Sequence, residues 1–196
     1  MAADEDRIRD MIRSCGWLME VLRAVRRAGL PDAWVGAGVL RDLVWGELYG
    51  PGFIPGEVHD VDVAFFDPAD LSRRRDEQAT ARLLAEGPGL PWQARNQAAV
   101  HTWYHARFGG EPVAPLRSVA GAVATWPETA TAVAIRLDPH GTPDVIEICA
   151  PLGLGDLLGG VWRRNPRRVS LDVSLARLER HQPARRWPGV RVVPPG

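Results

Sequence analysis

The sequence predicts a single α/β (α+β) domain, a small mixed sheet with helices packed on it. Two observations lead to this fold class: apolar residues near the N-terminus have helical spacing, and short β-rich runs alternate with helical segments further on. The chain has 196 residues, 45% of them hydrophobic, which is enough to bury one core. Its 20 glycines and 17 prolines are too few for a largely disordered chain.

The first third of the chain predicts a long helix followed by a compact strand–turn–helix–strand region. Apolar residues recur every three or four positions over residues 5–29, which predicts one amphipathic N-terminal helix that ends at Gly29. Residues 33–66 then predict, in order, a strand at 33–35, a glycine turn at 36–38, a helix at 39–45, a Gly- and Pro-rich loop at 46–57 and a strand at 58–66.

The remaining elements are shorter and contain no internal repeat or dividing linker. They are a helix at 72–86 capped by Ser72, a strand at 92–95, a helix at 96–106, a short helix after Ser118, two strands at 131–137 and 144–149 joined as a hairpin through 139–142, a turn and short helix at 151–160, and a helix near 172–180 within an Arg- and Pro-rich tail at 163–196.

Charge and cysteine content exclude several classes of protein. The 24 basic residues are all arginine and are balanced by 24 acidic ones, so no global charge favours a nucleic-acid or membrane coat. Two cysteines, Cys15 and Cys149, are too few for a disulfide framework. The N-terminus is acidic rather than signal-like, and no apolar run is long enough to span a bilayer. We therefore expect a soluble cytoplasmic protein without a membrane partner.

The most informative residues are Asp60 and Asp62. Residues two apart on a strand point to one face, roughly 6–7 Å apart, where two carboxylates repel by about 2.5 kcal/mol at an effective dielectric of 20. A bound Mg²⁺ would remove that repulsion, and carboxylate oxygens suit it. About one Asp-x-Asp is expected by chance among 14 aspartates, and Asp4 with Asp6 at a helix start is a second one. The β-rich context favours the 60–62 pair as the functional one.

Gly36 and Gly38 lie between a strand and a helix. Small residues there let backbone N–H groups approach a phosphate, and the helix N-terminus adds partial positive charge. A tight turn that needs glycine explains the same residues equally well.

Together these segments resemble the nucleotidyltransferase superfamily that includes polymerase beta and the tRNA CCA-adding enzymes. The run from Ala37 to Gly46, AGVLRDLVWG, is similar to the CCA-type pattern GG-x-V-R-D-x-L-x-G, with Ala37 where the first glycine belongs. The whole chain is similar to an uncharacterised bacterial nucleotidyltransferase-like family; the segments that carry this likeness are Asn96–His101, Trp126–Ala130, Glu147–Leu157 and Arg186–Pro188.

The resemblance implies a mechanism. A nucleoside triphosphate would bind with its phosphates against Gly36, Ala37 and Gly38, one or two Mg²⁺ would sit on Asp60 and Asp62, and an acceptor hydroxyl would displace pyrophosphate at the α-phosphate. The acceptor class (RNA, protein or small molecule) stays open. The expected nucleotide site also includes Arg41 and Asp42. Arg41 can bind a phosphate bidentately or form a salt bridge on the helix.

A third carboxylate is expected from a neighbouring strand, and Glu147 is the candidate because an acid in mid-strand costs stability unless it is used or paired. The alternative is that Glu147 pairs with Arg136 across the hairpin. Asp144 and Asp156 are the next candidates.

Several other polar residues are weaker candidates. Asn96, Gln97 and His101 share a predicted helix and could line the acceptor side, or be structural. His101 and His105 are four apart, but no third ligand has suitable spacing, which argues against zinc. The arginine cluster at 163–168 is typical of a solvated loop.

Two other functions compete with catalysis of nucleotidyl transfer. One is a non-catalytic nucleotide-binding or regulatory protein of the same fold. The other is a Rossmann-type dinucleotide binder, which position 41 disfavours because it is arginine where a third Gly or Ala belongs.

Overall fold

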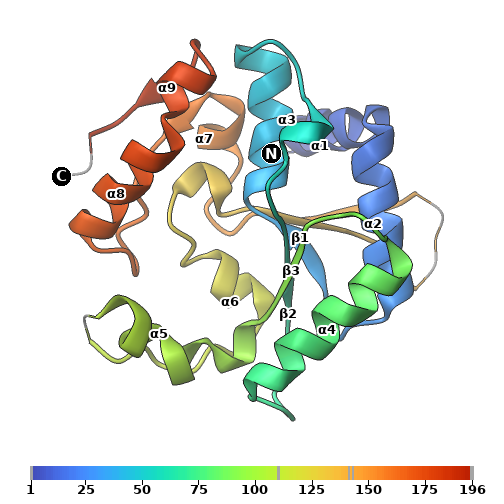
Figure 1. The fold of residues 1–196 in the computed structure, drawn as a ribbon. Coiled ribbons are helices and arrows are strands. Elements are labelled where there is room, and N and C mark those ends of the chain that lie inside the picture. Colours follow the sequence, from blue (N-terminus) through green and yellow to red (C-terminus); the bar gives the residue numbers. More distant parts are fainter. Residues whose placement is uncertain (1, 110, 141, 143, 195–196) are drawn as a thin grey trace.

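The computed structural model describes residues 2–109, 111–140, 142 and 144–194. A five-stranded mixed sheet, in the order β3-β2-β1-β4-β5, forms its centre (Figure 1). The strands are β1 (Trp34–Gly36), β2 (Val61–Phe65), β3 (Trp92–Asn96), β4 (Ala134–Leu137) and β5 (Ile146–Cys149). A separate two-stranded pair joins β6 (Val161–Trp162) and β7 (Arg191–Val192). These strands confirm the predicted single mixed-sheet domain.

The directions of the strands exclude the Rossmann-type dinucleotide binder. β1 is antiparallel to both β2 and β4, and β4 is antiparallel to β5. β2 and β3 are the parallel pair of this sheet, joined through α4 (Arg73–Glu86). A Rossmann domain needs a doubly wound parallel sheet, so this arrangement rules that domain out.

The other helices lie on both sides of the sheet. They are α1 (Ala2–Ser14), α2 (Gly16–Ala28), α3 (Gly38–Tyr49), α5 (Val100–Phe108), α6 (Val119–Val123), α7 (Gly155–Leu158), α8 (Leu171–His181) and α9 (Pro183–Arg186), with 3₁₀ turns at Pro55–Glu57, Gln97–Ala99 and Thr129–Thr131. Figure 1 shows α2 and α4 on one side of the sheet, and α5, α6 and α8 on the other. Within the described chain, no helix has the length and apolar character needed to cross a bilayer.

The main core fills the α2 and α4 side of the sheet. Val35, Val63 and Ile135, at matching register positions on three adjacent strands, are almost fully buried in it. Because side chains alternate along a strand, Asp62 and Ala64 point to the opposite side. There a smaller cluster, centred on Ala64 and α6, covers only part of the sheet face.

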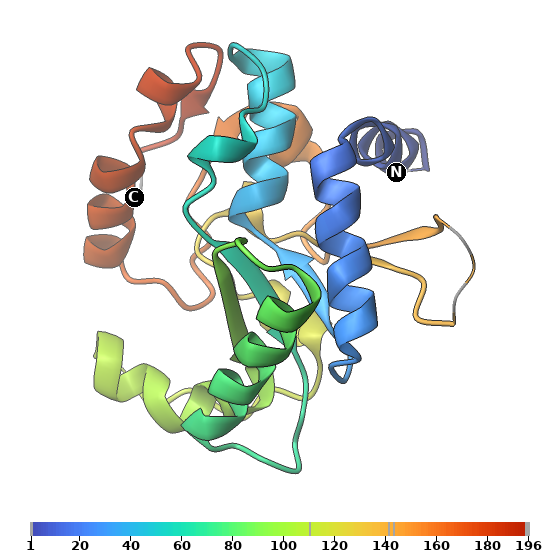
Figure 2. The same cartoon turned by 45° about the vertical axis from the view of Figure 1, so that its right-hand side comes forward.

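The N-terminal helix differs from its prediction. Instead of one helix over 5–29, the chain breaks at Cys15, whose backbone is extended (φ −94°, ψ 91°). The break follows Ser14, whose hydroxyl donates to the Asp10 carbonyl, and precedes Gly16, a weak helix former. Figure 2 shows α1 nearly end-on while α2 runs down the molecule. The break lets both apolar faces, with Ile8 and Ile12 on α1 and Leu18 on α2, enter the same core.

Smaller differences concern the boundaries of other elements. α3 continues to Tyr49, so the predicted loop at 46–57 is shorter than expected. The predicted helix at 96–106 begins as a 3₁₀ turn and becomes α5 only at Val100. Ser118 caps α6 as predicted, through a hydrogen bond from the Gly121 amide, whereas the side chain of Ser72 caps nothing. The β4–β5 hairpin is confirmed, but Gly141 in its predicted turn lies outside the described residues.

Candidate active site

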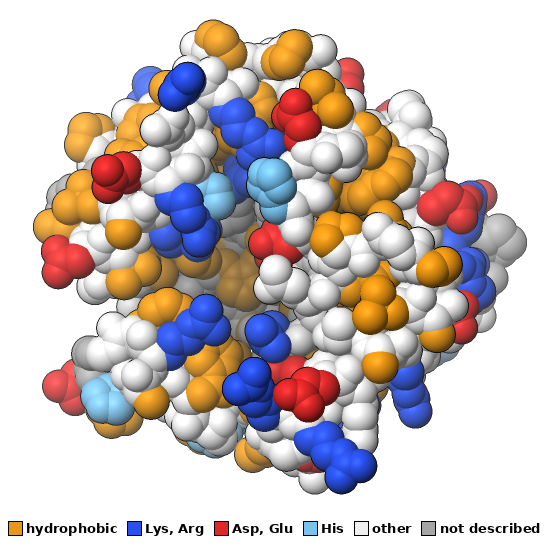
Figure 3. All heavy atoms as spheres, in the orientation of Figure 1, with side chains coloured by type: hydrophobic (Ala, Val, Ile, Leu, Met, Phe, Trp, Pro, Cys, Tyr) orange, Lys and Arg blue, Asp and Glu red, His pale blue; other side chains and the backbone are white. Residues whose placement is uncertain are grey.

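A cleft of about 600 Å³ separates the sheet from α8. It continues into a second hollow of about 440 Å³, because Gly38, Arg41, Asp60, Arg180 and His181 line both. Figure 3 shows this hollowed face, with an acidic side chain at its centre and arginines and histidines around it. One wall of the cleft is therefore acidic and the surrounding walls are basic.

The acidic wall consists of Asp60 and Asp62, at the start of β2. Burial, and next the charge of Asp60, raise the pKa of Asp62 to about 6. Among the described residues none hydrogen-bonds to the Asp62 carboxylate, and Asp60 accepts only a long bond of 3.5 Å from Gln93 Nε2. Arginine side chains nearby lower the Asp62 pKa without pairing with it. The result is a carboxylate pair whose charge the protein leaves incompletely neutralised.

The glycine turn lies beside this pair, between β1 and α3. A Cβ on Gly36 would lie 2.3 Å from the Trp126 ring, so the close approach of that ring requires glycine. Ala37 adopts φ 50° and ψ −100°, a conformation that side chains disfavour. It provides no side-chain cap to α3, and both Ala37 and Gly38 line the cleft. The first amides of α3 are therefore not capped by a side chain at this end.

Arg41 and Asp42 follow in the first turns of α3. The Arg41 side chain is 4% exposed and lies between the Trp162 and Trp187 rings, 5.8 and 5.2 Å from their centroids. Its Nε and Nη2 both donate to Asp42 Oδ1, at 2.8 and 2.6 Å. Arg186 donates to the other oxygen of Asp42 at 3.1 Å. The salt-bridge interpretation of Arg41 is therefore confirmed, and the same guanidinium still lines the cleft.

The third wall comes from α8, where the sequence indicated only a helix. Arg177, Arg180 and His181 are spaced to share one face of α8, and all three line the cleft. Burial first, and then four arginines, lower the pKa of His181 to about 3, so its imidazole stays neutral at pH 7. Its ring packs on Trp162 with centroids 5.4 Å apart. The spacing of these three residues in the sequence predicts that they share one face of a helix. The sequence does not indicate that this face lies against the cleft.

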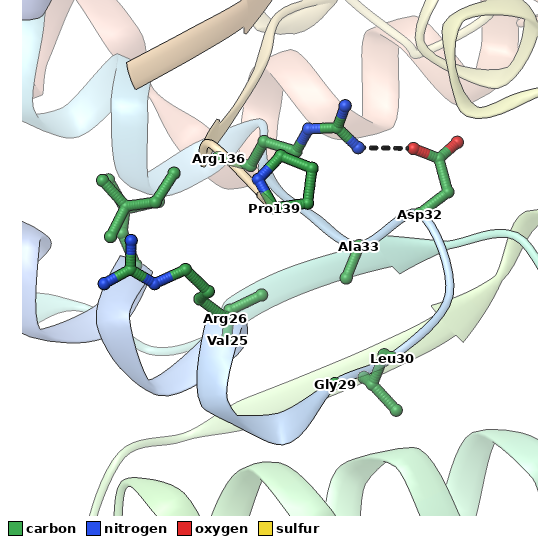
Figure 4. A pocket seen from close by; sticks show the side chains of 10 residues that line it. Val25, Arg26, Gly29, Leu30, Asp32, Ala33, Arg136 and Pro139 are labelled. Atoms are coloured by element: carbon green, nitrogen blue, oxygen red, sulfur yellow. Dashed lines mark hydrogen bonds and ion pairs between the residues drawn. The ribbon is translucent and has the colours of Figure 1, made fainter. Parts of the chain in front are cut away.

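Glu147 lies elsewhere than expected. It is on β5, separated from β2 by β1 and β4, which places it about 14 Å across the sheet. Arg136 Nε donates to Glu147 at 2.7 Å, as the alternative interpretation had it, and Arg136 Nη1 donates to Asp32 at 2.7 Å. Figure 4 shows Arg136 and Asp32 at a separate pocket of about 200 Å³ near the end of α2. Glu147 therefore serves a surface ion-pair network and lines neither hollow of the cleft.

The next candidates for a third carboxylate are also engaged elsewhere. Asp144 pairs with Arg23 on α2 at 3.3 Å. Asp156 accepts hydrogen bonds from Arg163 and from the hydroxyl of Thr129. In the part of the chain that the structure describes, the 600 Å³ cleft is lined by no carboxylate besides Asp60 and Asp62.

Asn96 and His101 do not line the cleft either. Asn96 is 1% exposed; its side-chain oxygen accepts from the Asp67 and Ala98 amides, and its nitrogen donates to two backbone carbonyls. All its hydrogen-bonding capacity thus fastens the loop after β2 to the end of β3. His101 has a buried Nδ1 for which the described part of the chain offers no hydrogen-bond partner. Within the described residues, no group of three His, Cys, Asp or Glu side chains is placed to hold a metal.

Comparison with known proteins identifies the family. A family model described as nucleotidyltransferase matches residues 23–192. A structure determined by NMR, described as a CCA-adding enzyme head domain, is 27% identical; the alignment covers 96% of this chain and 95% of that one, with a TM-score of 0.77. No curated protein matched the chain. The matched segment includes every residue that lines the cleft, from Ala37 to His181, and the chain belongs to the nucleotidyltransferase family.

Proposed function

We propose that this nucleotidyltransferase is magnesium-dependent and moves a nucleoside monophosphate from a nucleoside triphosphate to an acceptor hydroxyl. The observation that carries the proposal is the Asp60 and Asp62 pair, incompletely neutralised and beside the glycine turn at the start of α3. Family membership supports the reaction class, and the pair supplies a place for the cation.

Asp60 and Asp62 fit Mg²⁺ as a donor set. Both are hard oxygen ligands, and burial makes the charged form of Asp62 unfavourable until a cation compensates it. When bound, Mg²⁺ would stabilise the charge on the phosphoryl oxygens during displacement. The resemblance implied a third carboxylate, but we assign the protein's part of this site to two.

The chain's own groups bind and orient the triphosphate. The uncapped first amides of α3 and the positive end of its dipole attract phosphate oxygens. Arg41 adds a cation whose position is held by two tryptophans and Asp42, so little side-chain entropy is lost when it binds. Arg180 faces the same space from α8. The acceptor would enter from the β3 side, where Gln93 and Gln97 offer hydrogen-bonding groups.

Transfer of label from a triphosphate to a cell fraction tests the proposal. The protein is incubated with Mg²⁺ and triphosphates labelled on either the α- or the γ-phosphate, with RNA, protein and small-molecule fractions offered separately. Label from the α-phosphate should become covalently attached in one fraction, with release of pyrophosphate, and label from the γ-phosphate should not. Asp62→Asn should abolish the transfer.

Other outcomes identify the alternatives. Transfer of the γ-label would indicate a phosphotransferase instead. Binding of Mg²⁺ and triphosphate without transfer in any fraction would indicate the non-catalytic nucleotide-binding protein. Transfer that is unaffected by chelation of divalent cations would contradict the assigned role of the carboxylate pair.

A further inference from the structure

Glu128 is a fully buried acid that the proposed function does not yet use. It is 0% exposed and belongs to the segment between α6 and β4, of which Pro127 and Thr131 line the cleft. Its carboxylate accepts hydrogen bonds from Arg177 Nε at 2.6 Å and Arg177 Nη2 at 3.0 Å. The hydroxyl of Thr131 donates to it at 3.1 Å. The ion pair therefore joins α8 to the segment between α6 and β4, which also lines the cleft.

Attachment of α8 alone does not require a buried ion pair. Taking two charges out of water is costly, and apolar side chains of similar volume hold elements together as well or better. An ion pair additionally fixes the orientation of the arginine side chain, because a guanidinium and a carboxylate meet in a planar geometry with two hydrogen bonds. These hydrogen bonds use the Nε and Nη2 edge of Arg177, and among the residues that the structure describes its Nη1 has no hydrogen-bond partner.

The Nη1 end of Arg177 belongs to a side chain that lines the cleft. Arg177 and Asp62 line the same cleft, one from α8 and the other from β2. Arg177 is one-quarter exposed, while its partner Glu128 is sealed from solvent. A bound anion near Asp62 and its cation would therefore meet an arginine whose orientation is already set.

We propose that Arg177 is a phosphate-binding residue for the triphosphate, and that Glu128 is the positioning residue that presents its Nη1 to the cleft. This inference rests on the proposed function and adds to it a direct phosphate contact from Arg177, next to Arg180 on α8 and separate from the contacts of α3. Arg177 holds phosphate oxygens on the α8 side while the α3 amides and Arg41 hold them on the other.

Calorimetric titration with inorganic pyrophosphate and MgCl₂ tests the proposal without knowing the acceptor. Arg177→Lys keeps the charge but loses the two-bond geometry, and it should weaken pyrophosphate binding about tenfold or more, as for loss of one charged hydrogen bond. Glu128→Gln should weaken it as well, although Arg177 is unchanged. Arg73→Lys, on the exposed surface of α4, and Glu179→Gln, on the exposed side of α8, are the matched controls and should bind as wild type.

A paired replacement separates positioning from attachment. Glu128→Leu combined with Arg177→Met replaces the ion pair by an apolar contact, so α8 should stay attached and the circular dichroism and unfolding midpoint should resemble wild type. Pyrophosphate binding should still be lost. If this double variant binds pyrophosphate normally, Glu128 and Arg177 only attach α8 and the inference is wrong.

A measurement on the unaltered protein guards against variants that fail to fold. Pyrophosphate with Mg²⁺ should shift the NMR signal of the Arg177 Nε–H group and leave that of Arg73 in place. An unmoved Arg177 signal in a protein that binds pyrophosphate overturns this inference alone. Wild-type protein that binds no pyrophosphate in Mg²⁺ overturns the proposed function, and this inference with it.

Discussion

Replacing Asp62 by asparagine should stabilise the metal-free protein. The fold raises the Asp62 pKa from 3.8 to about 6, so the ionised carboxylate is less favourable in the folded state than in the unfolded one. A shift of about two units corresponds to a penalty of about 3 kcal/mol at pH 8, an upper bound because part of the side chain remains solvated. Asparagine keeps the size and removes the charge, so it should remove that penalty.

The sign of the effect is set by the direction of the shift. Above pH 6 the folded wild type carries the unfavourable charge, and the asparagine variant has its full advantage. As the pH falls from 6 toward 3.8, the folded wild type takes up a proton that the unfolded chain does not, so its stability recovers. The advantage of Asp62→Asn should therefore fall to about half by pH 5 and vanish below pH 4.

Urea unfolding followed by tryptophan fluorescence, in the presence of a chelator, measures this difference at pH 8 and pH 5. Asp6→Asn, which removes an exposed carboxylate on α1, is the control and should change little. Adding Mg²⁺ should stabilise wild type and not the Asp62→Asn variant. A variant destabilised by several kcal/mol at pH 8 would refute the reasoning, because it would mean that Asp62 is a paired structural carboxylate.

Three further substitutions test the surroundings of the cleft. Gly36→Ala should cost about 1–3 kcal/mol in urea unfolding and shift tryptophan fluorescence, since the new methyl group displaces Trp126; unchanged values would contradict the close packing. Ala37→Gly should raise stability by about 1 kcal/mol, because relief of a positive φ at about 1–3 kcal/mol exceeds the entropy cost of glycine, and a loss of stability would argue against strain there. The pKa of His181 is about 3 in the folded protein and 6.5 in the unfolded chain. As the pH falls below 6.5, the unfolded chain takes up a proton that the folded protein does not, so the free energy of unfolding decreases. His181→Gln should therefore lose less stability than wild type between pH 6.5 and pH 4, and parallel pH profiles would contradict a half-buried imidazole that stays neutral in the folded protein.

Local sequence patterns were enough to predict that the Asp60 and Asp62 pair and the glycine turn lie close together. Asp60 and Asp62 are separated from Gly36 and Gly38 by one helix and one loop, and adjacent strands of such a unit usually pair. That neighbouring arrangement brings both motifs to one edge of the cleft. Rejecting the Rossmann alternative on the residue at position 41 agreed with the sheet topology.

The rest depended on the order of strands and the facing of distant helices. Glu147 was chosen for its unusual place in mid-strand, but periodicity along a strand does not tell how many strands separate it from β2. Asn96 was chosen because it is polar, but its side chain hydrogen-bonds to the backbone of the loop after β2 and does not line the cleft. Arg177 pairs with Glu128, which is 49 positions away in the chain, and no local sequence pattern predicts such a contact.

The way α8 is attached has a consequence for how substrates enter and leave. Ser174 is its one fully buried residue, and its contacts include the ion pair of Arg177 with Glu128, the ring of His181 on Trp162 and the partly buried Leu178 against the main core. Segments with few buried apolar contacts open at low free-energy cost, well before the whole molecule unfolds. We expect the amides of α8 to exchange with solvent sooner than those of α2 or α3, and this exchange to slow when a polyphosphate bridges the two walls. Motion of this wall would then set the rate at which pyrophosphate is released.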